Sequence, residues 1–568
     1  MKKIALLFLL FASALQSASY EEVVDQNSYQ VLTPSLQKRK TAKIRLKNGL
    51  EAYLVSDPDA NQSAAALSFE VGSWNDDPKY PGIAHFLEHL LFLGSETYPE
   101  ENAYDKQVWD NGGTLNAYTA PDRTVYIFSV NNDAFPTTLD MFSHMFTDPL
   151  FSPSGVGREL HAVDQEHDKN IENDGNRAWM IFKETGNPSH PNALFSTGNL
   201  ETMKGIPPSV VRQWFEKNYH ANEAHLSLYS TLPLEELKEM TVRLFSSLPE
   251  GERRKTGIDE PLFSKHQEGH IIAIKPVKEI RELSIEWELP REYAANLDAS
   301  ADHLLGYVLR SKHEGSLYTK LKEEGLIDSL SSGIMRAGKE NALFSISFDL
   351  TPLGAKHFYR VIDQCFATLN NLKNEGIPPY IFQEKKTIAL IDYQYQSRIA
   401  PYQFVQGHAH SMIDEPLETY PMKSQLFSSY RPEEGEAFLK LLKPEQAAYF
   451  LIASPELTGI PPNKKERWLG AEYSLQKISE EALKRWETLS ENSLSPLPKQ
   501  NPYIPTELTL KHQGGSEKLV TPEPTRVIEK ERGVLYFWGD TQYHVPEVSW
   551  RFFLSTPAID GSPRQSVL

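Results

Sequence analysis

The predicted strands and helices occur in the same order twice along this chain, and this duplicated order restricts the possible folds more than any other sequence feature. Each copy has alternating strands, a helix, a Gly-containing turn, an aromatic-rich strand and a second amphipathic helix. In the first copy the aromatic strand is Thr124 to Val130, and the second copy begins at His270. Strands packed against helices in this order predict the α+β class, so we expect two homologous α+β domains.

The two copies and the segments around them divide the chain into five predicted parts. Residues 504–530 are polar and rich in Pro and Gly, which is typical of an interdomain linker. The sequence after this linker is too short to close another core. The parts are a signal peptide at 1–18, a catalytic domain at 21–262, a non-catalytic repeat at 267–503, the linker at 504–530 and the truncated beginning of a third domain at 531–568.

The composition is that of a folded protein without nucleic-acid partners. Of 568 residues, 40% are hydrophobic and 24% are charged, and the formal net charge is −18. Phosphate backbones repel such an acidic chain, and the sequence has no basic cluster, no Gly-x-Ser-x-Gly motif and no phosphate-binding Gly loop. Cys365 is the only cysteine, which excludes an internal disulfide, and its apolar neighbours favour a place in the core.

The first 18 residues have the three parts of a secretory signal. Lys2 and Lys3 precede an apolar run from Ile4 to Phe11, and small residues follow that run. We therefore expect export to the periplasm or the medium, followed by cleavage. No later run reaches the roughly 18 consecutive apolar residues that a membrane span needs, so we expect no membrane association after cleavage.

The segment His85-Phe86-Leu87-Glu88-His89 carries the strongest chemical signal. Its neighbours are apolar on every face of the predicted helix, which indicates a buried helix. Burying two imidazoles and a carboxylate is costly unless they are paired or bind a cation. His85 and His89 are four residues apart and project from one side of the helix, as two ligands of one zinc ion must.

A catalytic zinc site needs a third protein ligand and keeps its fourth position for water. The candidates for the third ligand lie in the segment RELHAVDQEHDKN, and they are Glu159, His161, Asp164, Glu166, His167 and Asp168. Glu159 and Glu166 are seven residues apart, or two helical turns, so one could bind the metal while the other orients a ligand. The spacing leaves open which of the two does which.

These groups predict metal-assisted hydrolysis of an amide bond. Zinc lowers the pKa of a bound water to about 7 and polarises a carbonyl group. Glu88, beside the two histidines, would take the water proton and pass it to the leaving amine. One zinc ion per chain is the expected cofactor.

At these positions the sequence resembles the zinc peptidases of the pitrilysin and insulin-degrading enzyme family, which carry an inverted His-x-x-Glu-His motif. The resemblance extends over roughly residues 40–560, and it rests on these segments: HFLEH, GTLNAYTAPDRTVYIFSV, ELHAVDQEHDKN, GNPSHP, FSTGNLET and SLYTKLKEEGLIDSL. It implies that Glu166 is the third zinc ligand and that Glu159 supports the site. It also implies that Asn116 and Ala117 bind substrate backbone by strand addition.

The resemblance implies a substrate class and a difference in length. Family members cleave peptides or small unfolded proteins inside two similar halves that close around the substrate. This sequence covers one half and the start of the next, so we expect a truncated chain. The alternatives left open are an active exported peptidase, a catalytically impaired remnant that binds zinc and peptide, and one half of a peptidase completed by a separate chain.

Overall fold

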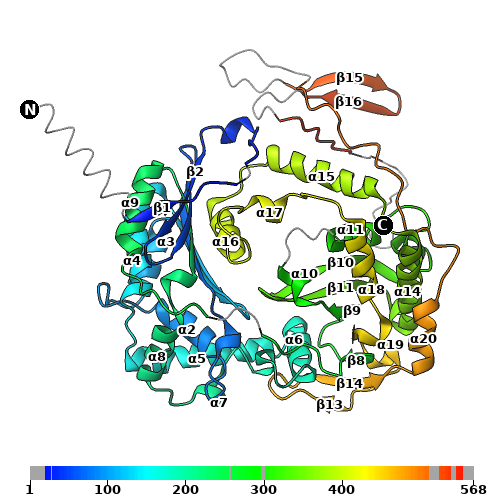
Figure 1. The fold of residues 1–568 in the computed structure, drawn as a ribbon, viewed down its shortest axis with the longest axis horizontal. Coiled ribbons are helices and arrows are strands. Elements are labelled where there is room, and N and C mark those ends of the chain that lie inside the picture. The colour runs from blue at the N-terminus through cyan, green and yellow to red at the C-terminus, as the bar shows by residue number, and fades with distance from the viewer. Residues whose placement is uncertain are drawn as a thin grey trace, which may run out of the picture.

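The computed structural model describes residues 19–26, 28–254, 258–295, 301–510, 523–538, 545–553 and 555. The first domain, which we take as the described residues up to 262, is built on a mixed sheet with strand order β1-β2-β3-β7-β4-β6-β5 (Figure 1). Only β3 and β7 run parallel, and β5 is an edge strand. The strands are β1 Tyr20–Glu22, β2 Lys40–Leu46, β3 Glu51–Ser56, β4 Ser63–Phe69, β5 Thr114–Thr119, β6 Thr124–Val130 and β7 Ala224–Ser230.

Helices cover one face of this sheet and close an aromatic core. The predicted helix with Leu139, Phe142 and Phe146 is present as α4, and its Phe146 ring packs against Phe69 and Tyr126 of the sheet. The helices are α2 Ile83–Leu91, α3 Ala103–Asp110, α4 Phe135–Thr147, α5 Pro153–Asn170, α6 Asp174–Thr185, α7 Leu200–Met203, α8 Pro208–Asn218 and α9 Leu234–Phe245.

The second domain, residues 267–503, repeats this architecture around a second sheet with strand order β10-β11-β9-β12-β8-β14-β13. Among the described residues of this domain only β8 and β12 run parallel, and this pair lies where the first sheet has β3 and β7. The prediction of two α+β domains is therefore confirmed. The strands are β8 His270–Ile274, β9 Glu282–Glu288, β10 Ile327–Gly338, β11 Asn341–Leu350, β12 Ala447–Ile452, β13 Lys464–Lys465 and β14 Glu472–Lys477.

The two domains differ in where one strand comes from. In the first sheet, β2 pairs with β3 and precedes it in the chain. In the second sheet the strand in that place is β14, which pairs with β8 and is the last strand of the sheet in chain order. The second-domain helices are α10 Arg291–Ala295, α11 Ala301–Leu309, α12 Leu317–Glu323, α13 Pro352–Lys356, α14 Phe358–Glu375, α15 Pro379–Gln394, α16 Pro401–Ser411, α17 Met422–Gln425, α18 Pro432–Leu441, α19 Pro455–Thr458 and α20 Glu480–Thr488. Cys365 lies fully buried on α14, and burial raises the pKa of its thiol.

Helix α16 belongs to the second domain by sequence but packs on the first sheet. It covers the face of β4, β6 and β7 that α4 leaves open (Figure 1). Phe404 stacks on Tyr53, and its edge meets Tyr229. The hydroxyl of Ser68 on β4 donates to the carbonyl of Ala409 at 2.6 Å. The first sheet is therefore packed against helices on both faces, and the helix on one face, α16, comes from the second domain.

The carboxyl-terminal part contains a two-stranded hairpin formed by β15 Thr525–Lys530 and β16 Gly533–Phe537. Strand β15 lies inside the range 504–530 that was predicted as a linker from its Pro and Gly content. The predicted signal at 1–18 lies outside the described residues. Across the part of the chain that the structure describes, none of the helices combines the length and the apolar composition that a bilayer span requires.

The domain contact at Glu70 predicts acid sensitivity. Its carboxylate accepts from His225 at 3.0 Å and from Lys339 of the second domain at 3.1 Å. Burial raises the pKa of Glu70, but these two cations outweigh burial and lower it from 4.5 to about 2. The stabilisation, about 3 kcal/mol from this shift, is present above pH 4.5 and is lost as the pH falls towards 2.

Glu70→Gln should therefore lower the thermal midpoint at pH 7 and flatten its decline between pH 5 and pH 3. The matched control is Glu472→Gln, which removes an exposed pair with Lys275 and should change both little. Thermal unfolding followed across pH measures the effect, and parallel pH profiles for Glu70→Gln and the unmodified protein would contradict it.

Candidate metal centre

Helix α2 is held in place by its apolar side chains and by a buried carboxylate at its start. Asp76 accepts from the backbone N–H groups of Gly82 at 2.7 Å and Ala84 at 2.9 Å, and so satisfies two donors of the first turn. Gly82 has φ +94°, and an added Cβ would lie 2.4 Å from the backbone of Gly198. The position therefore favours glycine both for its conformation and for its close approach.

The sequence suggested that this helix is buried on every face, but α2 is partly exposed on the side that carries its two histidines. The side chains of His85 and His89 are 14% and 25% exposed, whereas the apolar residues around them are buried. The difference arises because one side of α2 faces α5, whose polar residues line the site instead of closing over it.

His85, His89 and Glu166 converge on one point between α2 and α5. The two Nε2 atoms are 3.2 Å apart, and Glu166 Oε2 lies 3.4 Å from the first and 3.5 Å from the second. Donors bound tetrahedrally to zinc at 2.0 to 2.1 Å would be about 3.3 Å apart. The three atoms therefore have the spacing of ligands to one zinc ion, and the donor types are those zinc prefers.

The remaining ring nitrogens of both histidines have acceptors that fix the ring orientation. Nδ1 of His85 lies 2.7 Å from the carbonyl oxygen of Thr197, and Nδ1 of His89 lies 2.7 Å from Glu159 Oε1. A carbonyl oxygen can only accept, so Nδ1 of His85 carries a proton, and Nε2, which faces Glu166, is the nitrogen that would bind a metal. Support of this kind fixes the tautomer of metal-ligating histidines.

The electrostatics of the cluster favour a positive charge at its centre. Burial lowers the pKa of His89, but Glu159 and Glu166 outweigh it and raise that pKa to about 10. Burial also lowers the pKa of His85, but Glu166 and Glu88 outweigh burial, so the pKa of His85 is raised as well. Hydrogen bonding to the two histidines holds the pKa of Glu166 well below its usual range. A divalent cation would satisfy the same demand without protonating the histidines.

Glu88 is buried beside the two histidines and has one hydroxyl partner. Glu88 is only 7% exposed. Burial raises the pKa of its carboxyl, although the nearby His85 acts to lower it. Its Oε2 accepts from the hydroxyl of Thr119 at 2.6 Å. A carboxylate oriented next to a metal position, with a raised pKa, is suited to accept and return a proton.

The other candidates for the third ligand point elsewhere. His161 and Asp168 are exposed on α5, Asp164 accepts from the backbone N–H of Leu200, and His167 packs against the Phe195 ring. In the second domain, α11 lies between β9 and β10 as α2 lies between β4 and β5, and Gly306 and Tyr307 stand where the first copy has Glu88 and His89.

Asn116 and Ala117 lie on β5, the edge strand that passes α2. They pair with Ile127 and Tyr126 of β6, and no other strand of the described residues lies along the outer side of β5. Asn116 is exposed. The strand therefore has one edge at which an extended peptide could add.

Three groups of this site were missed from the sequence. Thr119 belongs to a segment that carried the family resemblance, but no role was predicted for it. The group that contacts His85 at Thr197 is a backbone carbonyl, which every residue type has. Asp76 lies six positions before Gly82, beyond the range in which a helix cap is normally sought. Only folding brings these groups to α2.

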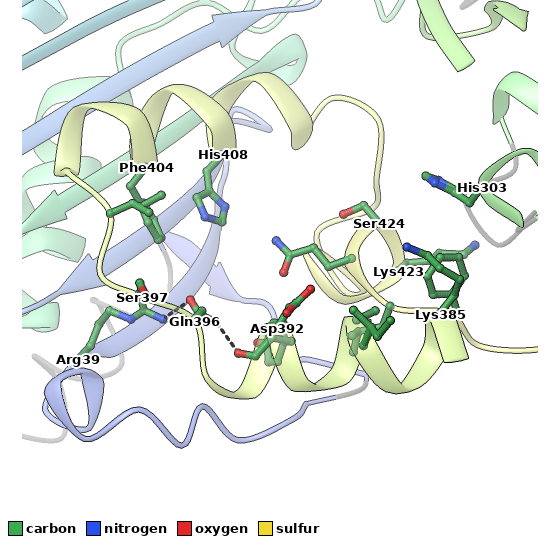
Figure 2. Close-up of a pocket in the computed structure, with 17 residues that line it drawn as sticks. Arg39, His303, Lys385, Asp392, Gln396, Ser397, Phe404, His408, Lys423 and Ser424 are labelled. Carbon is green, nitrogen blue, oxygen red and sulfur yellow. Dashed lines mark hydrogen bonds between the residues drawn. The ribbon is translucent and has the colours of Figure 1, made fainter. Parts of the chain in front are cut away.

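A cavity of about 570 Å³ lies elsewhere, between α15, α16 and α17 (Figure 2). Phe404 and His408 point into it from α16, while Lys385 and His303 lie on the far side. Arg39 donates to Gln396 at its other end at 3.0 Å. None of the predicted site residues lines this cavity, so it is separate from the candidate metal centre.

Three models of one peptidase family match successive parts of the chain. They are described as insulinase (peptidase family M16) over residues 52–190, the peptidase M16 inactive domain over 206–389, and the middle or third domain of peptidase M16 over 393–568. The chain belongs to the M16 family of pitrilysin and insulin-degrading enzyme, as the resemblance implied. The third model begins before α16, so it includes segments that we had assigned to the repeat at 267–503.

Relatives of known name support this membership over most of the chain. The insulin-degrading enzyme of Bos taurus is 30% identical over 96% of this chain and 54% of its own length, and Protease 3 of Escherichia coli is 30% identical over 100% and 58%. The crystal structure of pitrilysin superposes with a TM-score of 0.82 at 29% identity, over 91% of this chain and 55% of that one. The chain thus spans about half the length of the curated relatives it matches.

One zinc ion per chain should bind at this centre. His85→Ala or Glu166→Gln should reduce the bound zinc after dialysis from about one equivalent to near zero, because each removes a ligand. Glu159→Gln should weaken binding about 10- to 100-fold by releasing His89.

The control for these variants is His161→Ala, which changes an exposed histidine on the same helix and should leave zinc content unchanged. Elemental analysis and chelator competition measure the effects. Full zinc occupancy in Glu166→Gln would contradict the assignment of that ligand.

Proposed function

We propose that this protein is a zinc metalloendopeptidase that hydrolyses peptide bonds in peptides or small unfolded proteins. The observation that carries the proposal is the convergence of His85, His89 and Glu166 beside the buried carboxylate of Glu88. Membership of a peptidase family supports the same reaction class. Helices α2 and α5 supply three protein ligands, the number that a catalytic zinc site needs when its fourth position is kept for water.

The roles of the residues follow from their positions. His85, His89 and Glu166 would hold the zinc ion, and Glu159 would hold the ring of His89. Bound there, zinc supplies Lewis acidity that polarises the scissile carbonyl and lowers the pKa of water. Glu88 takes the proton of the attacking water and returns it to the leaving nitrogen, while the Thr119 hydroxyl orients its carboxylate.

Substrate would bind as an added strand on β5. Main-chain hydrogen bonds from an edge strand recognise extended backbone in any sequence, so they suit a peptidase with many substrates. Asn116 and Ala117 would make these contacts because they lie on β5 close to Thr119 and hence to Glu88.

A second candidate function has support from chain length. Because the chain spans about half the length of the relatives it matches, it could bind zinc and peptide without turnover, or act with a separate chain that supplies the remainder. This candidate predicts zinc uptake and peptide binding by the isolated protein, with hydrolysis absent until such a chain is added.

We further propose export, on the basis of residues 1–18. Expression with and without these residues, followed by fractionation and mass measurement of the mature chain, tests this proposal. A full-length product confined to the cytoplasm would contradict it.

Glu88→Gln should abolish hydrolysis without removing zinc. We expect kcat for a quenched fluorescent peptide to fall about 10³-fold, since the variant keeps the shape of the side chain but cannot accept the proton. A chelator should stop the unmodified protein, and added zinc should restore it. The matched control is Glu172→Gln, an exposed residue beyond the end of α5.

Zinc-loaded protein that cleaves no peptide would favour the second candidate function. Cleavage that persists in Glu88→Gln, or in the presence of the chelator, would overturn the proposed mechanism.

A further inference from the structure

The turn between β5 and β6, residues 120–123, is held by two separate elements of the second domain. Its charged residues, Asp122 and Arg123, both bond across the domain boundary. This turn is adjacent to Thr119, whose hydroxyl donates to Glu88. The second domain, whose described residues contain no candidate metal-ligand group, therefore contacts the edge of the first domain next to Glu88.

Arg123 is the buried centre of this contact, with 3% of its surface exposed. Its guanidinium donates to both carboxylate oxygens of Asp414 at 2.8 and 3.0 Å, and to the carbonyl oxygen of His410 at 2.7 Å. It also donates to the carboxylate of Asp122 at 2.9 and 3.0 Å. A fork held on two carboxylates fixes both the position and the plane of the guanidinium.

Two further bonds extend the contact along β5 and across the turn. The phenol oxygen of Tyr118, on β5, lies 2.8 Å from Nδ1 of His410 on α16. The backbone N–H of Lys339, in the β10–β11 turn, donates to Asp122 at 2.6 Å. The second domain thus holds Tyr118, Asp122 and Arg123 on both sides of Thr119.

We propose that Arg123 and Asp414 are a positioning pair, through which the second domain sets β5, and with it the Thr119 hydroxyl, against Glu88. The inference rests on the proposed function, in which β5 receives substrate and Glu88 transfers the proton. Arg123 and Asp414 touch neither zinc ligands nor substrate in this scheme. They act on the reaction through Thr119 and the edge strand.

The first domain also holds this turn, so a purely structural role has to be separated from positioning. The N–H groups of Ser73 and Trp74 donate to the carbonyl oxygens of Ala120 and Pro121 at 3.0 and 2.8 Å. These bonds hold the backbone at Ala120 and Pro121, whereas the side chains of Asp122 and Arg123 bond to each other and to the second domain. If they suffice, loss of Asp414 will cost stability without affecting turnover.

The structure provides a matched control at the opposite end of the same helix. Arg398, just before α16, pairs with the fully buried Asp57, which follows β3 at the far end of the first sheet. This pair also joins the second domain to the first sheet, but it is remote from β5 and its turn. Arg398→Gln therefore removes a domain contact of the same kind without touching the proposed route.

The experiment compares Asp414→Asn with Arg398→Gln in the full chain. Both should lower the thermal midpoint and keep one zinc ion. Asp414→Asn should lower kcat for the fluorescent peptide about tenfold, since small misplacements of reacting groups are costly, while Arg398→Gln should stay within about twofold. Hydrogen exchange of the β5 amides should quicken about tenfold in Asp414→Asn alone.

Tyr118→Phe is the second variant, in case Asp414→Asn does not fold. It removes only the hydroxyl that meets His410, and it should lower kcat about threefold and quicken exchange in β5 with little loss of stability. Asp414→Glu, which retains the charge, should recover part of the lost turnover.

Unchanged kcat and unchanged β5 exchange in Asp414→Asn would overturn the proposal, as would equal losses in Arg398→Gln. If the unmodified protein binds zinc but cleaves nothing, the proposed function fails. The exchange comparison then still decides the positioning: faster β5 exchange in Asp414→Asn alone supports the pair, and equal exchange in both variants overturns it.

Discussion

The cluster at α2 depends on a demand for positive charge that the protein side chains do not meet. Two imidazoles face the Glu166 carboxylate between two packed helices, with Glu88 and Glu159 close by. Three carboxylates in a partly buried space are costly unless cations accompany them. The pKa of both histidines is raised because protonated imidazoles would offset the negative charge of these carboxylates. A divalent cation would offset that charge more completely. The helix contacts, the Asp76 cap and the Gly82 turn all hold the donors in this arrangement.

The second domain shows how a duplicated fold can divide its tasks. The order of strands in its sheet matches that of the first sheet. However, α11 has Gly306 and Tyr307 where α2 has Glu88 and His89. What this domain supplies instead is cover and contact. Helix α16 buries the second face of the first sheet, and the β10–β11 turn reaches Asp122. Without this cover the first sheet would expose an apolar face.

The edge strand β5 is where these two contributions meet. One side of it pairs with β6, its end lies next to α2, and its turn is bonded to the second domain. An unpaired strand edge is a hazard for aggregation unless it is short, covered or used. This edge lies beside the candidate metal centre, where the proposed addition of a substrate strand would use it, and the bonds from the second domain hold its turn.

The pair of histidines on α2 could be predicted from the sequence, because the four-residue spacing of His85 and His89 puts both rings on one side of any helix. The sequence also determined that Glu159 and Glu166 share a face, and that two α+β units follow one another, because these patterns are local. The separation of roughly eighty residues between His89 and Glu166 is crossed only by packing α5 on α2, which no local pattern encodes. The roles of Asp76 and Thr119 and the docking of α16 could not be predicted from the sequence, since each depends on which distant segments pack together. Local periodicity fixes the direction of a side chain, whereas its partners are fixed by the cores that bring distant segments together.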